Sequence, residues 1–197
     1  MSMAPRHVDA LQELTTIGCG AALTALARLT GLRLDMDVPE SWIGTSAGAI
    51  ADFLGALGSD LVAVGVRLEG ALTGHLLLAL PEHDAEALAG ALGVPARQGE
   101  FGTLAESGLM ECGNIVGSAF VTAVARVVNQ TLLLSVPAFA RGSGKACVER
   151  LVDHAGSVAL AARFTSRADP QLEGLILVMP EPASIARLLS HLERPHG

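Results

Sequence analysis

Apolar residues follow two rhythms along the chain, and each predicts a kind of element. A three-to-four-residue repeat, typical of an amphipathic helix, runs through 6–30 and 104–128, whereas short β-branched runs predict strands. In the first half the pattern predicts a helix at 6–30 that stops at Gly31, a strand at 32–43, a helix at 47–58, strands at 61–69 and 72–80 joined by a turn at Glu69–Gly70, and a helix at 81–92.

The second half follows the same order. It predicts a helix at 104–128, a strand at 131–141, a helix at 145–155, strands at 158–166 and 172–179, and a helix at 182–193. The connection at 94–99 is too short for a flexible linker. We therefore expect residues 1–197 to form a single α+β domain with pseudo-two-fold symmetry, built from repeats at about 6–95 and about 100–195. Its two long helices would lie outside, with the remaining helices on the other face of the sheet.

Four positions recur at fixed spacings in the two halves. The intervals are four, three and 23 residues, and the second set lies 98 residues after the first: Asp9, Glu13, Thr16 and Pro39, then Ser107, Glu111, Asn114 and Pro137. A spacing kept over thirty residues and then repeated indicates an internal duplication. The prolines indicate an edge strand or the end of a strand.

The repeated polar residues share one side of each long helix. At 100° per residue from Ser107, Glu111 falls at about 40° and Asn114 at about −20°. The opposite sides are predicted to be buried, through Leu109, Val116, Phe120, Ala123 and Val127 in the second helix and Leu11, Ala22, Ala25 and Leu29 in the first. The polar stripe is therefore expected to face outward.

Glycines interrupt both long helices, at a cost of about 1 kcal/mol each in a helix interior. Gly20 lies in the polar stripe and Gly117 near its edge, whereas Gly18 and Gly113 lie on or beside the buried side. This placement indicates a close approach by another group.

Composition excludes several classes of function. The net charge of −7, with Lys145 the single lysine, argues against a nucleic-acid partner. The mean hydropathy is +0.47, but charges such as Arg28 and Arg126 break every long apolar stretch, so we expect no membrane span. Residues 1–7 lack an apolar signal region, and we expect a cytoplasmic protein.

Cysteine and histidine residues form no recognisable metal motif. Cys19, Cys112 and Cys147 are expected to be buried, reduced thiols, with a redox or metal role as the alternative. The six histidines lack the spacing that places two ligands on one helix face.

A simpler interpretation of Glu111 and Asn114 is that they are solvated residues on an exposed helix. The repeated spacing argues against this interpretation. Exposure to solvent requires no fixed spacing, and it does not explain glycines inside a helix.

With these residues the sequence resembles the CheC, CheX and FliY phosphatases of bacterial chemotaxis. Their signature is an acidic residue or serine, three residues, Glu, two residues, Asn, 22 residues, then Pro. The second set matches it throughout, whereas Thr16 replaces the expected Asn in the first. The resemblance spans nearly the whole chain, and its two motifs are more similar to CheC than to CheX, which carries one.

The resemblance implies a hydrolase of two-component signalling that removes the phosphoryl group from the aspartate of a CheY-like response regulator. Asn114 would orient the attacking water, and Glu111 would form a salt bridge to the regulator's active-site lysine. The chain itself would need no cofactor, because the regulator would supply Mg²⁺.

The threonine leaves the first site open to three interpretations: weak activity, docking through Glu13 alone, or silence. Asp9 and Ser107 would support the motifs, and Ser107 either tunes Glu111 or has no catalytic role.

A non-catalytic adaptor that binds a response regulator or the receptor deamidase CheD is the alternative function. A role in the flagellar switch, as in FliY, is disfavoured by the lack of an extra domain. A hydrolase with its own pocket is disfavoured because the chain has no Gly-x-Ser-x-Gly elbow.

Overall fold

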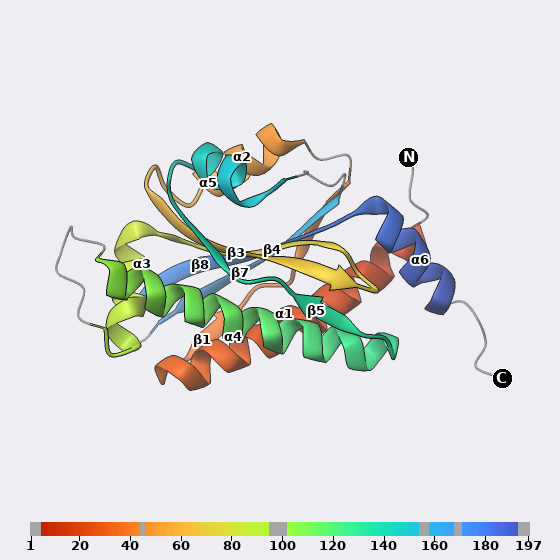
Figure 1. Cartoon of the computed structure of the whole chain (residues 1–197), viewed down its shortest axis with the longest axis horizontal. Helices are drawn as coiled ribbons and strands as arrows, with labels where there is room; N and C mark the ends of the chain where they lie inside the picture. The colour runs from red at the N-terminus through yellow and green to blue at the C-terminus, as the bar shows by residue number, and fades with distance from the viewer. Residues whose placement is uncertain (1–4, 44–45, 95–101, 154–157, 168–170, 193–197) are drawn as a thin grey trace.

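The computed structural model describes residues 5–43, 46–94, 102–153, 158–167 and 171–192 (Figure 1). Within these ranges the chain forms six helices and eight strands. In chain order they are α1 (Pro5–Thr30), β1 (Leu34–Met36), β2 (Glu40–Ile43), α2 (Ala47–Gly55), β3 (Leu61–Gly70), β4 (Gly74–Pro81), α3 (Glu82–Ala91), α4 (Thr103–Val128), β5 (Leu132–Leu134), β6 (Ala138–Gly142), α5 (Gly144–Leu151), β7 (Val158–Ser166), β8 (Leu172–Pro180) and α6 (Pro182–Leu192).

One antiparallel sheet contains strands from both halves of the chain. Its order is β1-β7-β8-β4-β3-β5, with β2 also paired to β7 and β6 also paired to β3. The two long helices lie side by side over one face of this sheet (Figure 1). The α+β class and the exposed position of the long helices are confirmed.

Alternating side chains divide the core into two layers. On β3, Val62, Val64 and Val66 point to the face covered by α1 and α4, whereas Leu61 and Ala63 point to the face covered by α2 and α5. All five are buried, because a strand covered on both faces must be apolar on both.

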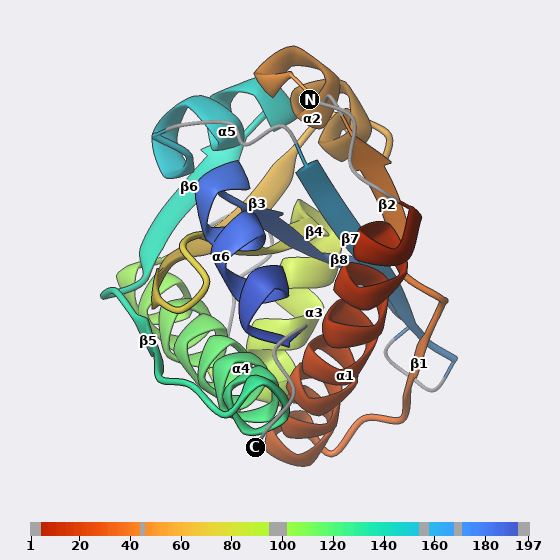
Figure 2. The ribbon, with the colours of Figure 1, turned by 90° about the vertical axis from the view of Figure 1, so that its right-hand side faces the viewer.

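The expectation that the remaining helices share the other face is wrong for α3 and α6. Leu88 of α3 and Leu188 of α6 belong to the same apolar core as α1 and α4. Figure 2 shows α6 on the side of the long helices. Each of these helices follows directly from a strand, and its apolar residues are buried on that side of the sheet.

The strands predicted at 32–43 and 131–141 are each two short strands. Pro39 separates β1 from β2, and Pro137 separates β5 from β6. Proline cannot donate a ladder hydrogen bond, so pairing stops there and resumes on the same neighbour. The prediction of edge strands at both prolines is confirmed, since these pairs flank the sheet on its two sides.

The hairpin turn lies later than predicted. Glu69 and Gly70 still belong to β3, and the turn occupies 71–73. Gly70 has a φ of +96°, and a Cβ there would overlap the carbonyl oxygen of Thr131. Its role is a close backbone approach to the segment before β5 rather than a turn.

Two helices end before their predicted limits. The helix α2 ends at Gly55 rather than 58, and α5 ends at Leu151, where Val152 is extended. Residues 154 and 155 of the predicted helix lie outside the described ranges. The stop at Gly31 is confirmed by its φ of +73°.

The halves are related in their strand pairing as well as in their element order. Val62 pairs with Leu80, and Leu160 pairs with Val178, 98 residues later in both strands. Each half contributes helix, strand, strand, helix, strand, strand, helix. A common origin of the halves, and the single-domain boundary at 1–197, stay predictions.

Among the described helices, α4 is long and apolar enough to cross a membrane by length and composition. Its apolar side packs on the sheet and on α1, as in the core helix of a globular protein.

Candidate functional site

The buried side of each long helix consists of two rows in which residues are four apart. In α4 the rows are Ala105, Leu109, Gly113, Gly117 and Val121, and Cys112, Val116, Phe120, Val124 and Val128. In α1 they are Leu11, Thr15, Cys19 and Leu23, and Leu14, Gly18, Ala22 and Leu26. Such rows run at an angle to the helix axis, so the contact face shifts around the helix along its length.

This drift corrects part of the predicted buried side. Val127 is 48% exposed and Leu29 is 40% exposed, while Ala123 and Ala25 are half-buried. A fixed angle of 100° per residue holds over about three turns and then departs from a face that follows the four-residue rows.

Two of the glycines allow close packing, as their position predicted. A Cβ at Gly18 would overlap the ring of Phe120 from α4, and a Cβ at Gly113 would overlap Cγ1 of Val64 in β3. Both long helices therefore lie closer to their neighbours than any side chain would permit.

The repeated polar residues lie on the solvent side of these helices. Asp9, Glu13 and Thr16 are exposed on α1; Ser107 and Glu111 are exposed on α4. Asn114 is half-buried. The buried rows thus leave both polar stripes accessible.

Glu111 and Asn114 lie one turn apart on the same side of α4. Among the described residues, neither side chain takes part in a hydrogen bond or an ion pair. A free carboxylate can accept hydrogen bonds from a cationic side chain of a partner, and a side-chain amide can both donate and accept hydrogen bonds. The two groups can therefore act together on a partner that docks along the helix.

The hydroxyls of Thr16 and Ser107 are engaged on their own helices. Thr16 Oγ1 donates to the carbonyl of Gln12, and Ser107 Oγ donates to the carbonyl of Thr103, each at 2.8 Å. Sequence reasoning missed these bonds, although Ser and Thr inside helices commonly bond to the carbonyl four residues earlier. Thr16 keeps its acceptor lone pairs, but its proton is already used.

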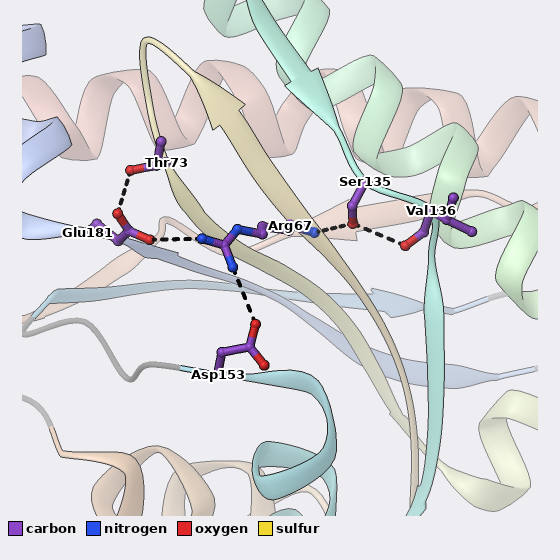
Figure 3. Close-up of polar contacts among 6 residues, drawn as sticks. All are labelled: Arg67, Thr73, Ser135, Val136, Asp153 and Glu181. Atoms are coloured by element: carbon purple, nitrogen blue, oxygen red, sulfur yellow. Dashed lines mark hydrogen bonds and ion pairs between the residues drawn. The ribbon is translucent and has the colours of Figure 1, made fainter.

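The segment around Pro137 is fixed to strand β3. Ser135 Oγ accepts a 2.9 Å hydrogen bond from the backbone N–H of Arg67 and donates to the carbonyl of Val136 (Figure 3). The backbone N–H of Ser135 donates to the carbonyl of Arg67 at 3.0 Å. Pro39 is buried and Pro137 is half-buried, so both act as part of the scaffold beside the helices.

The side chain of Arg67 extends this anchor to two further elements. Its guanidinium lies 3.3 Å from the Asp153 carboxylate and 3.8 Å from that of Glu181, which also accepts from Thr73 at 2.7 Å (Figure 3). These contacts join β3, the turn before β4, and the ends of α5 and β8.

The three cysteines are free and buried, as predicted. Burial raises the pKa of the Cys19 and Cys112 thiols to about 12, and the charge of Glu111 adds to the effect at Cys112. Thiols with such pKa values are poor nucleophiles and metal ligands at neutral pH. No group of three or more His, Cys, Asp or Glu residues suited to a metal occurs in the described ranges.

Comparisons with known proteins agree with this geometry. Residues 7–43 match the CheC-like family. The CheY-P phosphatase CheC of Bacillus subtilis is 33% identical over 135 residues, which cover 66% of this chain and 64% of that protein. This match spans less than two thirds of the relative's length.

Two solved structures share the fold. FliY of Thermotoga maritima covers 97% of this chain and 98% of its own, with a TM-score of 0.71 and 15% identity. One chain of a CheX–CheY–BeF₃–Mg²⁺ complex from Borrelia burgdorferi matches 84% of this chain and 97% of its own length, with a TM-score of 0.59 and 19% identity. With its signature residues on two exposed helices of this fold, the chain is similar to the CheC/CheX/FliY family.

Proposed function

We propose that this chain is a phosphatase that hydrolyses the aspartyl phosphate of a CheY-like response regulator in the cytoplasm, with α4 as its active helix. The observation that carries the proposal is the adjacent pair Glu111 and Asn114, accessible on one side of α4 and unengaged by other described side chains. The relatives named as CheY-P phosphatases, and the CheX–CheY complex, support the same substrate class.

The chemistry requires little of the chain beyond positioning. Phosphoryl transfer passes through a loose transition state, so a catalyst mainly aligns water with the phosphorus and stabilises the spreading charge. The amide of Asn114 accepts a hydrogen bond from the attacking water and donates one to a phosphoryl oxygen. The carboxylate of Glu111 binds the regulator's active-site lysine and fixes the approach of the amide.

The regulator, not this chain, supplies Mg²⁺ in this proposal. A bound Mg²⁺ neutralises charge on the phosphoryl oxygens and prefers carboxylate ligands. Among the described residues of the polar stripe on α4, Glu111 provides the carboxylate within one turn of Asn114, and in this proposal it binds the regulator's lysine.

The first site is weaker or silent because of Thr16. Its side chain is shorter than asparagine, it is stiff at χ1, and its proton is used within α1. Glu13 remains accessible and can still contribute to docking.

The test is the decay of a phosphorylated CheY-like regulator from the same organism. We expect wild-type protein to accelerate decay. Asn114→Ala should reduce the acceleration by about 10²-fold or more, because its amide contacts the transition state. Glu111→Ala should reduce it by about 10²-fold, because the carboxylate positions that amide. Thr16→Asn should increase activity. Glu149→Ala is the matched control, because Glu149 is an exposed glutamate on α5, across the sheet from α4.

A regulator that binds but decays no faster would contradict the enzyme and favour the adaptor. In that alternative the same stripe binds the response regulator or CheD without hydrolysis. The fold shared with FliY is compatible with either function.

A further inference from the structure

Beyond the catalytic pair, the polar stripe of α4 continues as a row of residues four apart. The row starts at Asn114 and passes through Ser118 and Thr122 to Arg126, all three of the later residues being exposed. It parallels the buried rows, so it stays on the solvent side for the length of the helix. At 1.5 Å per residue, Arg126 lies about 18 Å along the axis from Asn114.

A hollow of about 490 Å³ borders the far end of this row. Thr122 and Arg126 form one side of it, and Asn129, Gln130 and Leu132 form the other, where the chain turns from α4 into β5. Asn129 makes this turn with a left-handed φ of 51°. The hollow therefore combines a cation, amides and an apolar leucine in an open surface.

The other half of the chain has an equivalent hollow of about 310 Å³. Its lining includes Thr24, Arg28 and Leu34, each 98 residues before Thr122, Arg126 and Leu132. Thr24 and Arg28 continue the row of Thr16 and Gly20 on α1. The feature thus accompanies both copies of the motif, and it is larger beside the copy that carries the complete Glu-x-x-Asn sequence.

The charges along α4 are separated. Glu106 and Glu111 lie toward its beginning, and Arg126 is the single basic residue of its last turn. Among the described residues no carboxylate forms an ion pair with Arg126 or Arg28. A cation near a helix C-terminus is favourable to the helix dipole. That effect explains the sign of the charge, but it requires neither a hollow beside it nor a row that leads back to the catalytic amide.

We propose that the hollow beside Arg126 is a second contact point for the docked response regulator, which places an acidic surface segment there while its phosphorylated site faces Asn114. This inference rests on the proposed function. A folded domain of about 100 residues has a radius of gyration of about 13 Å, which corresponds to a sphere of radius about 17 Å. A segment at the periphery of a regulator centred on Asn114 therefore comes within reach of the long Arg126 side chain. An acidic end and a basic end on one stripe permit a single direction of docking, which sets the regulator's orientation on the helix.

The test compares two charge reversals, Arg126→Glu and Arg28→Glu. Both change the net charge by the same amount and both alter the last turn of a motif helix, so effects on overall charge and helix stability are matched. The probe is the CheY-like regulator of the same organism, bound in its BeF₃–Mg²⁺ form for affinity and phosphorylated for kinetics.

We expect Arg126→Glu to weaken binding about five- to tenfold and to raise KM with kcat unchanged, because an exposed cation at the rim contributes to encounter and not to the reaction. The salt dependence of binding should become shallower. Arg126→Gln should give a smaller change in the same direction. Arg28→Glu should weaken binding less than Arg126→Glu does, because its motif carries Thr16 in place of the asparagine.

Each outcome decides the inference. If Arg126→Glu binds as tightly as wild type, or if Arg28→Glu weakens binding equally, the second contact point is wrong while the phosphatase stands. If wild-type protein binds without accelerating decay and Arg126→Glu still binds less tightly, the contact stands and the enzyme does not. If wild-type protein does not bind, both are overturned.

Discussion

At the scale of single residues, the absence of a side chain at Gly113 sets the distance between α4 and the sheet. A methyl group there would overlap Val64, and the helix or the strand would have to move. Gly20, in the equivalent helix, has nothing within 4 Å of its Cβ direction.

We therefore expect opposite effects from Gly113→Ala and Gly20→Ala. Gly113→Ala should lower the free energy of unfolding by about 1–3 kcal/mol through overpacking. Gly20→Ala should raise it by up to about 1 kcal/mol through helix propensity. Urea unfolding of both variants measures the difference, and equal stabilities would show that the close contact has no energetic weight.

Buried thiols make stability depend on alkaline pH. The pKa of Cys19 and Cys112 is about 12 in the folded protein and 9.0 without burial. Between these values the unfolded chain loses protons that the folded chain keeps, so the free energy of unfolding falls as pH rises above 9, by about 1.4 kcal/mol per unit for each thiol.

Unfolding midpoints measured between pH 8 and 11 test this, with the variant carrying both Cys19→Ala and Cys112→Ala as the reference. That variant should have the shallower decline. An identical decline would assign the loss of stability to other groups.

The spacing of residues in the sequence correctly placed Glu111 and Asn114 on the same side of a helix and predicted close packing at Gly18 and Gly113. The role of Glu111 and Asn114 in a reaction stays a prediction. The spacing did not identify the bonds of Thr16 and Ser107 to Gln12 and Thr103, which depend on the rotamer.

At the scale of elements, the hydroxyl of Ser135 and one backbone hydrogen bond fix the junction between β5 and β6 to β3. Ser135→Ala leaves the Arg67 N–H without its side-chain acceptor, and we expect a loss of about 0.5–1.5 kcal/mol in stability. Faster amide hydrogen exchange at Arg67 should accompany it. Ser135→Thr keeps the hydroxyl and serves as the control; unchanged exchange in Ser135→Ala would remove the hydroxyl from this role.

The periodicity of apolar residues predicted the type of each element well. It did not predict where the strands break or which face of the sheet each helix covers. Apolar runs predicted continuous strands across Pro39 and Pro137, whereas the missing N–H of each proline divides them. The placement of α3 beside α4 depends on the direction in which the chain leaves β4, which local sequence does not encode.

At the scale of the whole molecule, each half of the chain supplies the pairing partner for the edge strands of the other half. The strands β1 and β2 of the first half pair with β7 of the second, and β5 and β6 of the second pair with β3 of the first. Sequence reasoning predicted the repeat but not this exchange, because pairing partners far apart in the chain leave no local signal.

We expect the fragments 1–97 and 98–197 to be unfolded separately and to associate when mixed. Each alone lacks the neighbour for two of its strands and the sheet beneath its long helix. Circular dichroism of each fragment and of the mixture checks this, and a stably folded single fragment would contradict it.

The glycine contact of α4 has a consequence for how the two motifs can change with time. Val64, on which Gly113 rests, belongs to the half that carries Thr16. Substitutions in the first motif can therefore accumulate while its half of the chain is retained. Deleting that half would remove the structural support of Glu111 and Asn114. Under the proposed duplication, the half that carries Thr16 would be retained as the structural support of the half that carries Asn114.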